Sequence, residues 1–398
     1  MKKMLLLLLA ASLIGPARTA EPLLERIDVF EGGKEGYAFY RIPGLVVTSK
    51  GTVLAYCEAR RSSSDWSSID IMMRRSMDGG KTWAPRQKMA DIPGPKKKNP
   101  AVLGTNLASP DEITYNNPVA IVDRDGPIHF LFCLEYMRCF YQRSDDDGLT
   151  WSKPREITST FDGFRGHYDW KVIATGPGHG IQLKNGRLVA PVWISPATGA
   201  GAHRPSVTAT IFSDDAGQTW RNGEIAAPDT QEWVFPNEAM AVQLIDGRVL
   251  LNVRTEAKVH RRLVTISPDG ASKWSKPAFD DALLEPVCMA SIARISEKPR
   301  KNRILFSNPA NLGRADGNTA TVRQDRKNLS IKLSYDEAKT WPVNKVLDPG
   351  YSSYSDVAVL SDGTLLCLYE RGASRPDFLT LARFNLEWLT DGKDSLAE

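Results

Sequence analysis

The sequence has no long apolar run after its first twenty residues. No later stretch approaches the roughly 18 uninterrupted apolar residues that a membrane-spanning helix needs. This absence excludes a helical membrane protein, and we expect no membrane insertion.

Net charge is also small. Three of the 51 Lys and Arg residues lie within residues 1–20, so removal of that segment leaves 48 basic against 47 acidic residues. A balanced chain lacks the basic surface of nucleic-acid-binding proteins, so we expect no nucleic-acid partner. The one dense basic run, Lys96 to Lys98 in PGPKKKNP, lies between prolines and is interpreted as a solvated loop.

Histidine and cysteine are scarce, with five of each, and their spacing matches no metal site. Without a C-x-x-C pair or a histidine cluster, we expect neither a metal nor a cofactor. We interpret the cysteines as buried free thiols, although an exported chain could pair Cys133 with Cys139. The five are Cys57, Cys133, Cys139, Cys288 and Cys367.

The first residues have the layout of an export signal. MKKMLLLLLAASLIGPARTA places two lysines before an apolar run from Met4 to Ile14, followed by small residues. This layout predicts a secretory signal peptide over residues 1–20 and a mature chain, residues 21–398, that is secreted or periplasmic.

One eight-residue pattern recurs along the chain. SMDGGKTW, SDDDGLTW and SDDAGQTW are close copies, whereas SPDGASKW and SYDEAKTW are degraded ones. Their first serines stand 68, 69, 54 and 67 residues apart. At that period, the mature chain has room for about six units.

Between the copies, the chain alternates short apolar runs with turns. IVDRDGPIHFLFCLEY, GHGIQLKNGRLVAPVW, AMAVQLIDGRVLLNVR and SDVAVLSDGTLLCLYE each place two such runs around a turn that contains glycine. No segment sustains the 3.6-residue period of a helix. A ring of repeats with about four strands each is a β-propeller. The sequence therefore predicts an all-β, six-bladed β-propeller that forms a single domain.

The repeated octapeptide is interpreted as scaffold and not as an active site. Its Ser and Asp can hydrogen-bond the backbone of a tight turn, and its Gly supplies a positive φ. Its Trp can bury a large ring between sheets. The chain is expected to be a monomer, and a monomer needs its active site only once.

These octapeptides resemble the Asp-boxes, S-x-D-x-G-x-T-W, of sialidases (neuraminidases) and other propellers. YRIPGLVV, residues 40–47, resembles the Arg-Ile-Pro motif of sialidases. AYCEARR, SDWSSIDI, NEAMAVQLIDGRVLLNVR, DRKNLSIKLSYDEAKTW and YSDVAVLSDGTLLCLYE then follow in the family's order, and LARFNLEWL resembles its last strand. The resemblance covers essentially all of the mature chain and is greatest to bacterial exo-α-sialidases of glycoside hydrolase family 33.

The resemblance implies a substrate pocket at the centre of one face, where three arginines bind the carboxylate of sialic acid. Carried over by motif, these are Arg41, Arg254 and Arg326. Glu370 would orient Arg41. Arg60, in EAR, is expected either to contact the substrate or to form a salt bridge.

The resemblance also assigns three catalytic residues. Asp65 matches the acid/base, Tyr354 the nucleophile and Glu238 the glutamate that activates the tyrosine. Trp66 follows Asp65 where the family more often has a small or polar residue, which leaves the shape of the acid/base loop open.

Neighbouring residues offer alternatives to two of these assignments. Arg314 and Arg323 lie near Arg326 but lack its Arg-x-Asn-Leu pattern, and Tyr351 lies near Tyr354 without the following Ser-Asp.

These residue types suit a sialoside. Guanidinium groups bind carboxylate oxygens in pairs. An anionic substrate would repel a carboxylate nucleophile, whereas a tyrosine stays neutral until a base takes its proton. Two successive displacements imply retention of configuration, and tyrosine nucleophiles are an established variant among sialidases.

The leading hypothesis is a hydrolase that releases terminal sialic acids from glycoproteins, glycolipids or oligosaccharides. A trans-sialidase, an enzyme for a sialic acid variant and a non-catalytic carbohydrate-binding propeller are the alternatives. The loops around residues 96–111 and 161–170 would read the N-acyl group. The presence of Asp65, Glu238 and Tyr354 together argues against the binding module.

Overall fold

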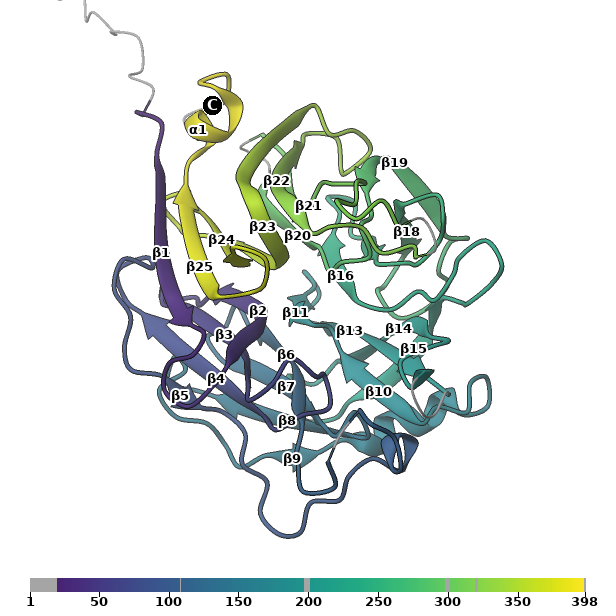
Figure 1. The fold of residues 1–398 in the computed structure, drawn as a ribbon. Coiled ribbons are helices and arrows are strands. Elements are labelled where there is room, and N and C mark those ends of the chain that lie inside the picture. The colour runs from purple at the N-terminus through teal and green to yellow at the C-terminus, as the bar shows by residue number, and fades with distance from the viewer. Residues whose placement is uncertain (1–19, 108, 197–200, 298–300, 319–320, 397–398) are drawn as a thin grey trace, which may run out of the picture.

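The computed structural model describes residues 20–107, 109–196, 201–297, 301–318 and 321–396. The strands form five sheets arranged around a common centre (Figure 1). This arrangement confirms an all-β, propeller-like fold. The signal peptide predicted over residues 1–20 lies outside the described residues, apart from Ala20.

Four of the sheets contain four or five strands each. The first comprises β2 (Phe39–Val47), β3 (Val53–Arg60), β4 (Ile69–Ser76) and β5 (Gln87–Lys88). The second comprises β11 (Gly178–His179), β6 (Tyr115–Val122), β7 (Ile128–Leu134), β8 (Arg138–Ser144) and β9 (Arg155–Glu156). The third comprises β10 (Val172–Thr175), β12 (Ile181–Gln182), β13 (Leu188–Ser195), β14 (Val207–Ser213) and β15 (Arg221–Ala227). The fourth comprises β16 (Ala239–Gln243), β17 (Val249–Val253), β18 (Arg261–Ser267) and β19 (Ala278–Leu284).

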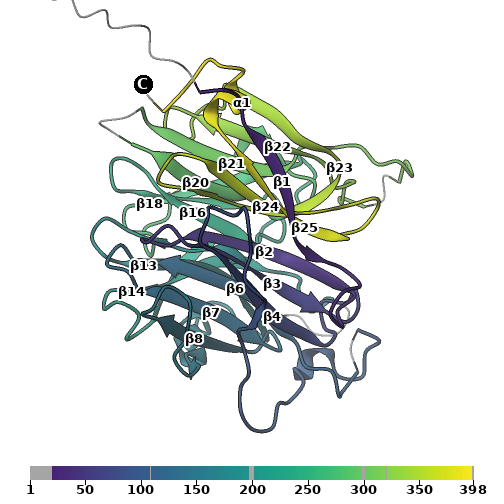
Figure 2. The ribbon, with the colours of Figure 1, turned by 90° about the vertical axis from the view of Figure 1, so that its left-hand side faces the viewer.

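The fifth sheet has seven strands and contains both ends of the fold. In spatial order these are β1 (Leu24–Glu31), β25 (Phe378–Phe384), β24 (Leu365–Gly372), β23 (Val343–Val359), β22 (Lys327–Ser334), β21 (Arg303–Pro309) and β20 (Ser291–Ser296). Figure 2 shows β1 lying along β25. The 17-residue β23 pairs with β22 through its first part and with β24 through its second part. Five sheets are therefore present, and the count of six blades stays a prediction.

Apolar side chains fill the space between neighbouring sheets. The strands β3, β7 and β13 are buried along their whole length, because they lie in sheet interiors that are covered on both faces. Strand β2 contacts β6 on one side and β23 on the other, while β16 contacts both β13 and β20. These contacts between sheets close the ring.

The repeated octapeptides form the turns that the sequence predicts. In the second copy, Ser144 Oγ donates to Asp146 at 2.9 Å, and the backbone N–H of Gly148 donates to Ser144 Oγ at 2.9 Å. The Thr150 hydroxyl donates to the other oxygen of Asp146 at 2.5 Å. The five copies share the Ser–Asp contact, and their tryptophans pack against five different apolar clusters between sheets. Their scaffold role is confirmed.

Helices are short. They are the 3-10 segments η1 (Pro100–Val102) and η2 (Thr158–Phe164) and the helix α1 (Leu386–Thr390). The segment LARFNLEWL, expected as one strand, ends its strand at Phe384 and continues as α1, whose first turn is capped by the Asn385 side chain. The Asn385 side chain accepts from the backbone N–H of Trp388 at 3.0 Å, which is the usual contact of an N-cap.

The basic run is not a fully solvated loop. Lys98 is buried, and its ammonium group donates to the backbone oxygens of Trp66 at 2.8 Å and Glu112 at 2.9 Å. It also pairs with the buried Glu135 at 3.2 Å. A buried cation needs such partners. They come from other segments of the chain, so the composition of the basic run alone could not reveal them.

All five cysteines are buried and free, as expected. Among the described residues, no helix is long and apolar enough to cross a membrane.

Candidate active site

Seven of the eight residues assigned by motif line one cavity of about 510 Å³. They are Arg41, Arg60, Asp65, Glu238, Arg254, Arg326 and Tyr354. Most of them lie where a strand begins or ends, so one face of the ring gathers them. The eighth, Glu370, is fully buried on β24 behind Arg41.

Irregular strand pairing directs two of these side chains into the cavity. The register between β23 and β24 shifts between Ser352 and Ser355, around Tyr354, and that between β2 and β3 shifts just after Arg41. Such bulges re-aim side chains and are frequent beside active sites. Ile42 adopts φ 59°, and its backbone N–H donates to Glu370 Oε1 at 3.0 Å.

Tyr354 is buried at the cavity wall and contacts a glutamate and an arginine. Its hydroxyl donates to Glu238 Oε1 at 2.5 Å and accepts from Arg254 Nη1 at 2.7 Å. Burial raises the pKa of Tyr354 well above its ordinary value; Arg254 opposes this shift and the negative Glu238 adds to it. The phenol is therefore neutral at neutral pH, and it is hydrogen-bonded to the Glu238 carboxylate.

Three guanidinium groups surround the ring of Tyr354. Those of Arg41 and Arg326 lie 5.5 and 5.3 Å from the ring centroid, and Arg254 contacts the hydroxyl. Glu370 pairs with Arg41 at 3.2 Å. Arg326 donates to the Ser353 hydroxyl at 3.0 Å and to a backbone oxygen at 2.7 Å, and it has no carboxylate partner among the described residues. The guanidinium group of Arg326 can therefore bind an anionic ligand.

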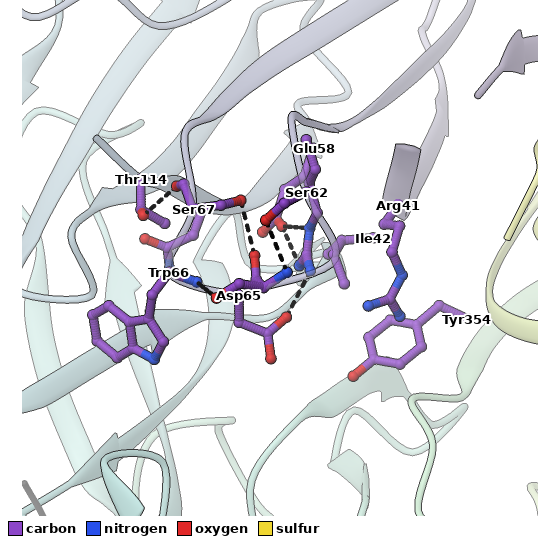
Figure 3. Close-up of polar contacts among 12 residues, drawn as sticks. Arg41, Ile42, Glu58, Ser62, Asp65, Trp66, Ser67, Thr114 and Tyr354 are labelled. Carbon is purple, nitrogen blue, oxygen red and sulfur yellow. Dashed lines mark hydrogen bonds and ion pairs between the residues drawn. The ribbon is translucent and has the colours of Figure 1, made fainter. Parts of the chain in front are cut away.

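Asp65 faces the same space from the loop after β3, opposite the ring of Tyr354 (Figure 3). Its side chain is 48% exposed, so a ligand can reach it. Arg60 Nη1 pairs with Asp65 at 2.6 Å, and the same guanidinium pairs with the buried Glu58 at 2.5 Å. Although burial favours the neutral acid, Arg60, assisted by His203 and Arg41, holds the pKa of Asp65 below its usual range.

Trp66 anchors the loop that carries Asp65. Its indole is 3% exposed and lies 4.6 Å from the ring of Tyr136 and 5.3 Å from that of His203. Trp193 completes this group of rings, at 5.3 Å from His203. Because the buried indole of Trp66 holds the loop in place, a large residue fits at this position, where the sequence comparison led us to expect a small or polar one.

The ring group shows what the motifs missed. Tyr136, Trp193 and His203 line the cavity, yet no motif or spacing marks them. Burial lowers the pKa of His203 to about 4, helped by Arg204 and opposed by Asp65, so the imidazole is neutral at neutral pH.

The two loops expected to read the N-acyl group differ in position. Asn106 and Leu107, from the first loop, line the cavity. No residue of the segment 161–170 does; Phe164, His167 and Tyr168 instead line a separate, more apolar pocket.

The structure also distinguishes the alternative residues for the third arginine and for the tyrosine. Arg323 lines the cavity together with Arg326, whereas Arg314 is not among the lining residues and pairs with Asp316. Tyr351 does not line the cavity, whereas Tyr354 does. Arg204 is another guanidinium at the cavity wall, paired with Glu256.

Comparisons with known proteins agree with this geometry. The model of the BNR repeat-like domain matches residues 107–367. The sialidase of Micromonospora viridifaciens is 33% identical over 93% of this chain and 55% of its own length. The sialidase of Bacteroides fragilis is 29% identical over 88% of this chain and 63% of its own length. The chain thus spans little more than half of these relatives.

Solved structures share the fold. A Hadza microbial sialidase, 27% identical, superposes with a TM-score of 0.73 over 92% of this chain and 69% of its own. A leech intramolecular trans-sialidase, 19% identical, gives a TM-score of 0.72 over 92% and 71% of the two chains.

Proposed function

Because the chain belongs to the family of BNR repeat-like domains and is similar to bacterial sialidases along most of its length, we propose that it is a retaining exo-α-sialidase. It hydrolyses terminal sialic acids from glycoproteins, glycolipids or oligosaccharides through a tyrosine nucleophile. The observation that carries this proposal is the 2.5 Å contact between Tyr354 and Glu238 beneath three guanidinium groups.

The guanidinium groups of Arg41, Arg254 and Arg326 bind the carboxylate of the substrate. Glu370 and Glu238 already neutralise two of them, and only Arg326 lacks a carboxylate. This arrangement limits the repulsion in the empty site while leaving a net attraction for one anion. Fixed cations next to the anomeric carbon also favour the flattened ring of an oxocarbenium-like transition state.

In the first displacement, Glu238 takes the proton of Tyr354 as the phenolic oxygen bonds to the anomeric carbon. The bond from that carbon to the glycosidic oxygen breaks, and Asp65 gives its proton to the leaving oxygen. In the second, Asp65 deprotonates a water that attacks the same carbon, and Tyr354 leaves and regains its proton from Glu238. Two inversions retain the configuration.

Asp65 must gain a proton before it can act as an acid. In the free protein, its pairing with Arg60 at 2.6 Å favours the ionised form. Substrate binding therefore has to weaken the Arg60–Asp65 contact, and Glu58 offers Arg60 a second carboxylate at 2.5 Å. In this proposal, Arg60 has two roles: it controls the protonation state of Asp65, and it contacts the substrate.

We further propose six blades, with the seven-stranded sheet supplying two. One apolar cluster joins the two halves of this sheet. Leu305 on β21 and Ile331 on β22 belong to one half, and Cys367 and Tyr369 on β24 belong to the other. The halves thus face each other as separate blades do. We also propose a monomer that is secreted or periplasmic.

Hydrolysis of 4-methylumbelliferyl α-sialoside by the purified mature chain tests the activity. We expect fluorophore release together with free sialic acid. No turnover anywhere between about pH 4 and pH 8 would favour a carbohydrate-binding module. Sialic acid that appears on an added lactose acceptor, and not free in solution, would identify a transferase.

Proton NMR of the same reaction tests the stereochemistry. The first sialic acid released is expected to be the α anomer, because each of two displacements inverts the anomeric carbon. Release of the β anomer first would overturn the tyrosine intermediate.

A further inference from the structure

Six guanidinium groups line the cavity, and most are matched by carboxylates. Arg41 pairs with Glu370, Arg60 with Glu58 and Asp65, Arg204 with Glu256 and Arg254 with Glu238. Among the residues that the structure describes, Arg326 and Arg323 have no carboxylate partner.

The proposed function accounts for Arg326 but not for Arg323. Arg326 lies over the ring of Tyr354, where the carboxylate of the terminal sialic acid binds. Arg323 is exposed, and within the described ranges its guanidinium makes neither a hydrogen bond nor an ion pair. Loss of solvation lowers the pKa of Arg323 and the charges of Arg204 and Arg254 lower it further, while Glu256, which is already paired with Arg204, opposes the shift. A cation that faces more positive than negative charge gains from a ligand that brings a further anion.

In the reactive state, the cavity has one more positive charge than negative charges. When Asp65 carries the proton that it needs as the acid, six guanidinium groups face four carboxylates: Glu58, Glu238, Glu256 and Glu370. The carboxylate of one sialic acid makes five anions. The remaining cation is Arg323, which is exposed and has no carboxylate partner among the described residues.

Arg323 is exposed and also lines the cavity, so it lies where the cavity opens to solvent. Asp65, which protonates the leaving oxygen, is followed by Trp66, and the indole of Trp66 packs on His203. The next residue, Arg204, lines the same cavity as Arg323. A leaving group that Asp65 protonates therefore lies in the cavity that Arg323 borders.

We propose that Arg323 binds a second anionic group of the substrate, carried by the sugar next to the terminal sialic acid. The chemistry is that of a carboxylate or a sulfate ester, from an inner sialic acid or a sulfated sugar. The proposal rests on the sialidase function and deepens it, because it names a preferred class of leaving group.

The test compares three substrates with the mature chain and with Arg323→Gln. The substrates are α2,3-sialyllactose, whose leaving group is neutral, α2,8-disialyllactose, and a sialyllactose sulfated on its galactose. We expect Arg323→Gln to lower kcat/KM for the charged substrates about threefold to fivefold more than for the neutral one, the effect of one exposed charged contact. Added salt shrinks the preference, and Arg323→Lys retains most of it. If Arg323→Gln lowers kcat/KM for only one of the two charged substrates, that substrate identifies the source of the anion.

Arg248→Gln is the matched control. Arg248 is an exposed arginine that pairs with Asp246 at 2.7 Å and does not line the cavity, so this variant should keep the wild-type ratios. An equal loss on all three substrates would place Arg323 in the clamp for the terminal carboxylate and overturn the proposal. Unchanged ratios would overturn it too, while leaving the sialidase function standing. Failure of the wild-type chain to cleave any of the three would reject both.

Discussion

At the scale of single residues, Tyr354 makes the contacts on which the proposed chemistry depends most directly. Tyr354→Phe removes the hydroxyl that Glu238 and Arg254 hold and keeps the ring between Arg41 and Arg326. We expect kcat to fall about a thousandfold or more, as in other enzymes that lose their nucleophile. Binding of a 2,3-unsaturated sialic acid inhibitor should persist, measured by calorimetry.

Tyr351→Phe is the control for this variant, because Tyr351 belongs to the same strand but does not line the cavity. It should keep near-normal turnover. Near-normal turnover by Tyr354→Phe would instead refute the nucleophile.

Arg60 sets the pH dependence of the acid. The positive charge of Arg60 stabilises ionised Asp65 and lowers its pKa, so Arg60→Gln raises that pKa towards the ordinary value of about 4. In the proposed mechanism, activity needs protonated Asp65, so we expect kcat/KM to fall as the pH rises through the pKa of Asp65. The fall should therefore move to higher pH in the variant, whatever the loss in absolute rate.

The pH profile of kcat/KM measures this shift, and thermal unfolding checks that the variant is folded. A fall that stays at its wild-type position would mean that Arg60 acts only on the substrate or the fold.

At the scale of elements, the repeated turns depend on their aspartates. Hydrogen bonds from the Thr150 hydroxyl and backbone N–H lower the pKa of Asp146 to about 2. A folded-state pKa below the unfolded value of about 4 stabilises the fold above that pH, and this contribution is lost as the pH falls towards 2.

Asp146→Asn should therefore lower Tm by about 1–3 °C at pH 7 and by less near pH 3. Asp145→Asn is the matched control, because Asp145 is exposed and pairs only with Arg143 within the described residues. Thermal unfolding from neutral to acidic pH distinguishes them; a difference between the variants that does not shrink with acid would contradict the role of the charge.

Sequence patterns predicted the elements that depend on local signals. The hairpins and the octapeptide turns follow from alternating apolar residues, glycines and self-bonding Ser and Asp side chains, which act over a few residues. The shared strand β23 was not predictable, since its two halves pair with strands on opposite sides and only the packed ring decides where one blade stops.

The candidate site was predictable where a motif fixes a residue and its neighbours, as with Arg41 and Tyr354. It was not predictable where loops from different sheets meet. His203 and Arg204 reach the cavity because their loop packs on Trp66, and the bulges that aim Arg41 and Tyr354 leave no distinct trace in the sequence.

At the scale of the whole molecule, the pairing of β1 with β25 joins the two ends of the fold within one sheet, and we call this pairing the closure. Asp28 on β1 accepts from Arg371 at 2.8 Å and from Thr380 at 2.5 Å. Asp28→Ala should destabilise the fold by about 1 kcal/mol, since these charged contacts are partly exposed. Denaturant unfolding measures the loss.

Glu31→Ala is the control in the same strand, because Glu31 makes only a 3.8 Å exposed contact with Lys34. Equal stability of the two variants would mean that the closure depends on backbone pairing and apolar contacts alone.

The same pairing constrains how the protein is made. The residues joined in the Asp28–Thr380 contact are 352 positions apart, so β1 stays without its partner until β25 has been translated. Until then, β1 and the free edge of β24 offer unpaired backbone groups to any other nascent chain. The seven-stranded sheet can therefore be completed only once β25 has been translated, and a chain truncated before Phe378 has no partner for β1.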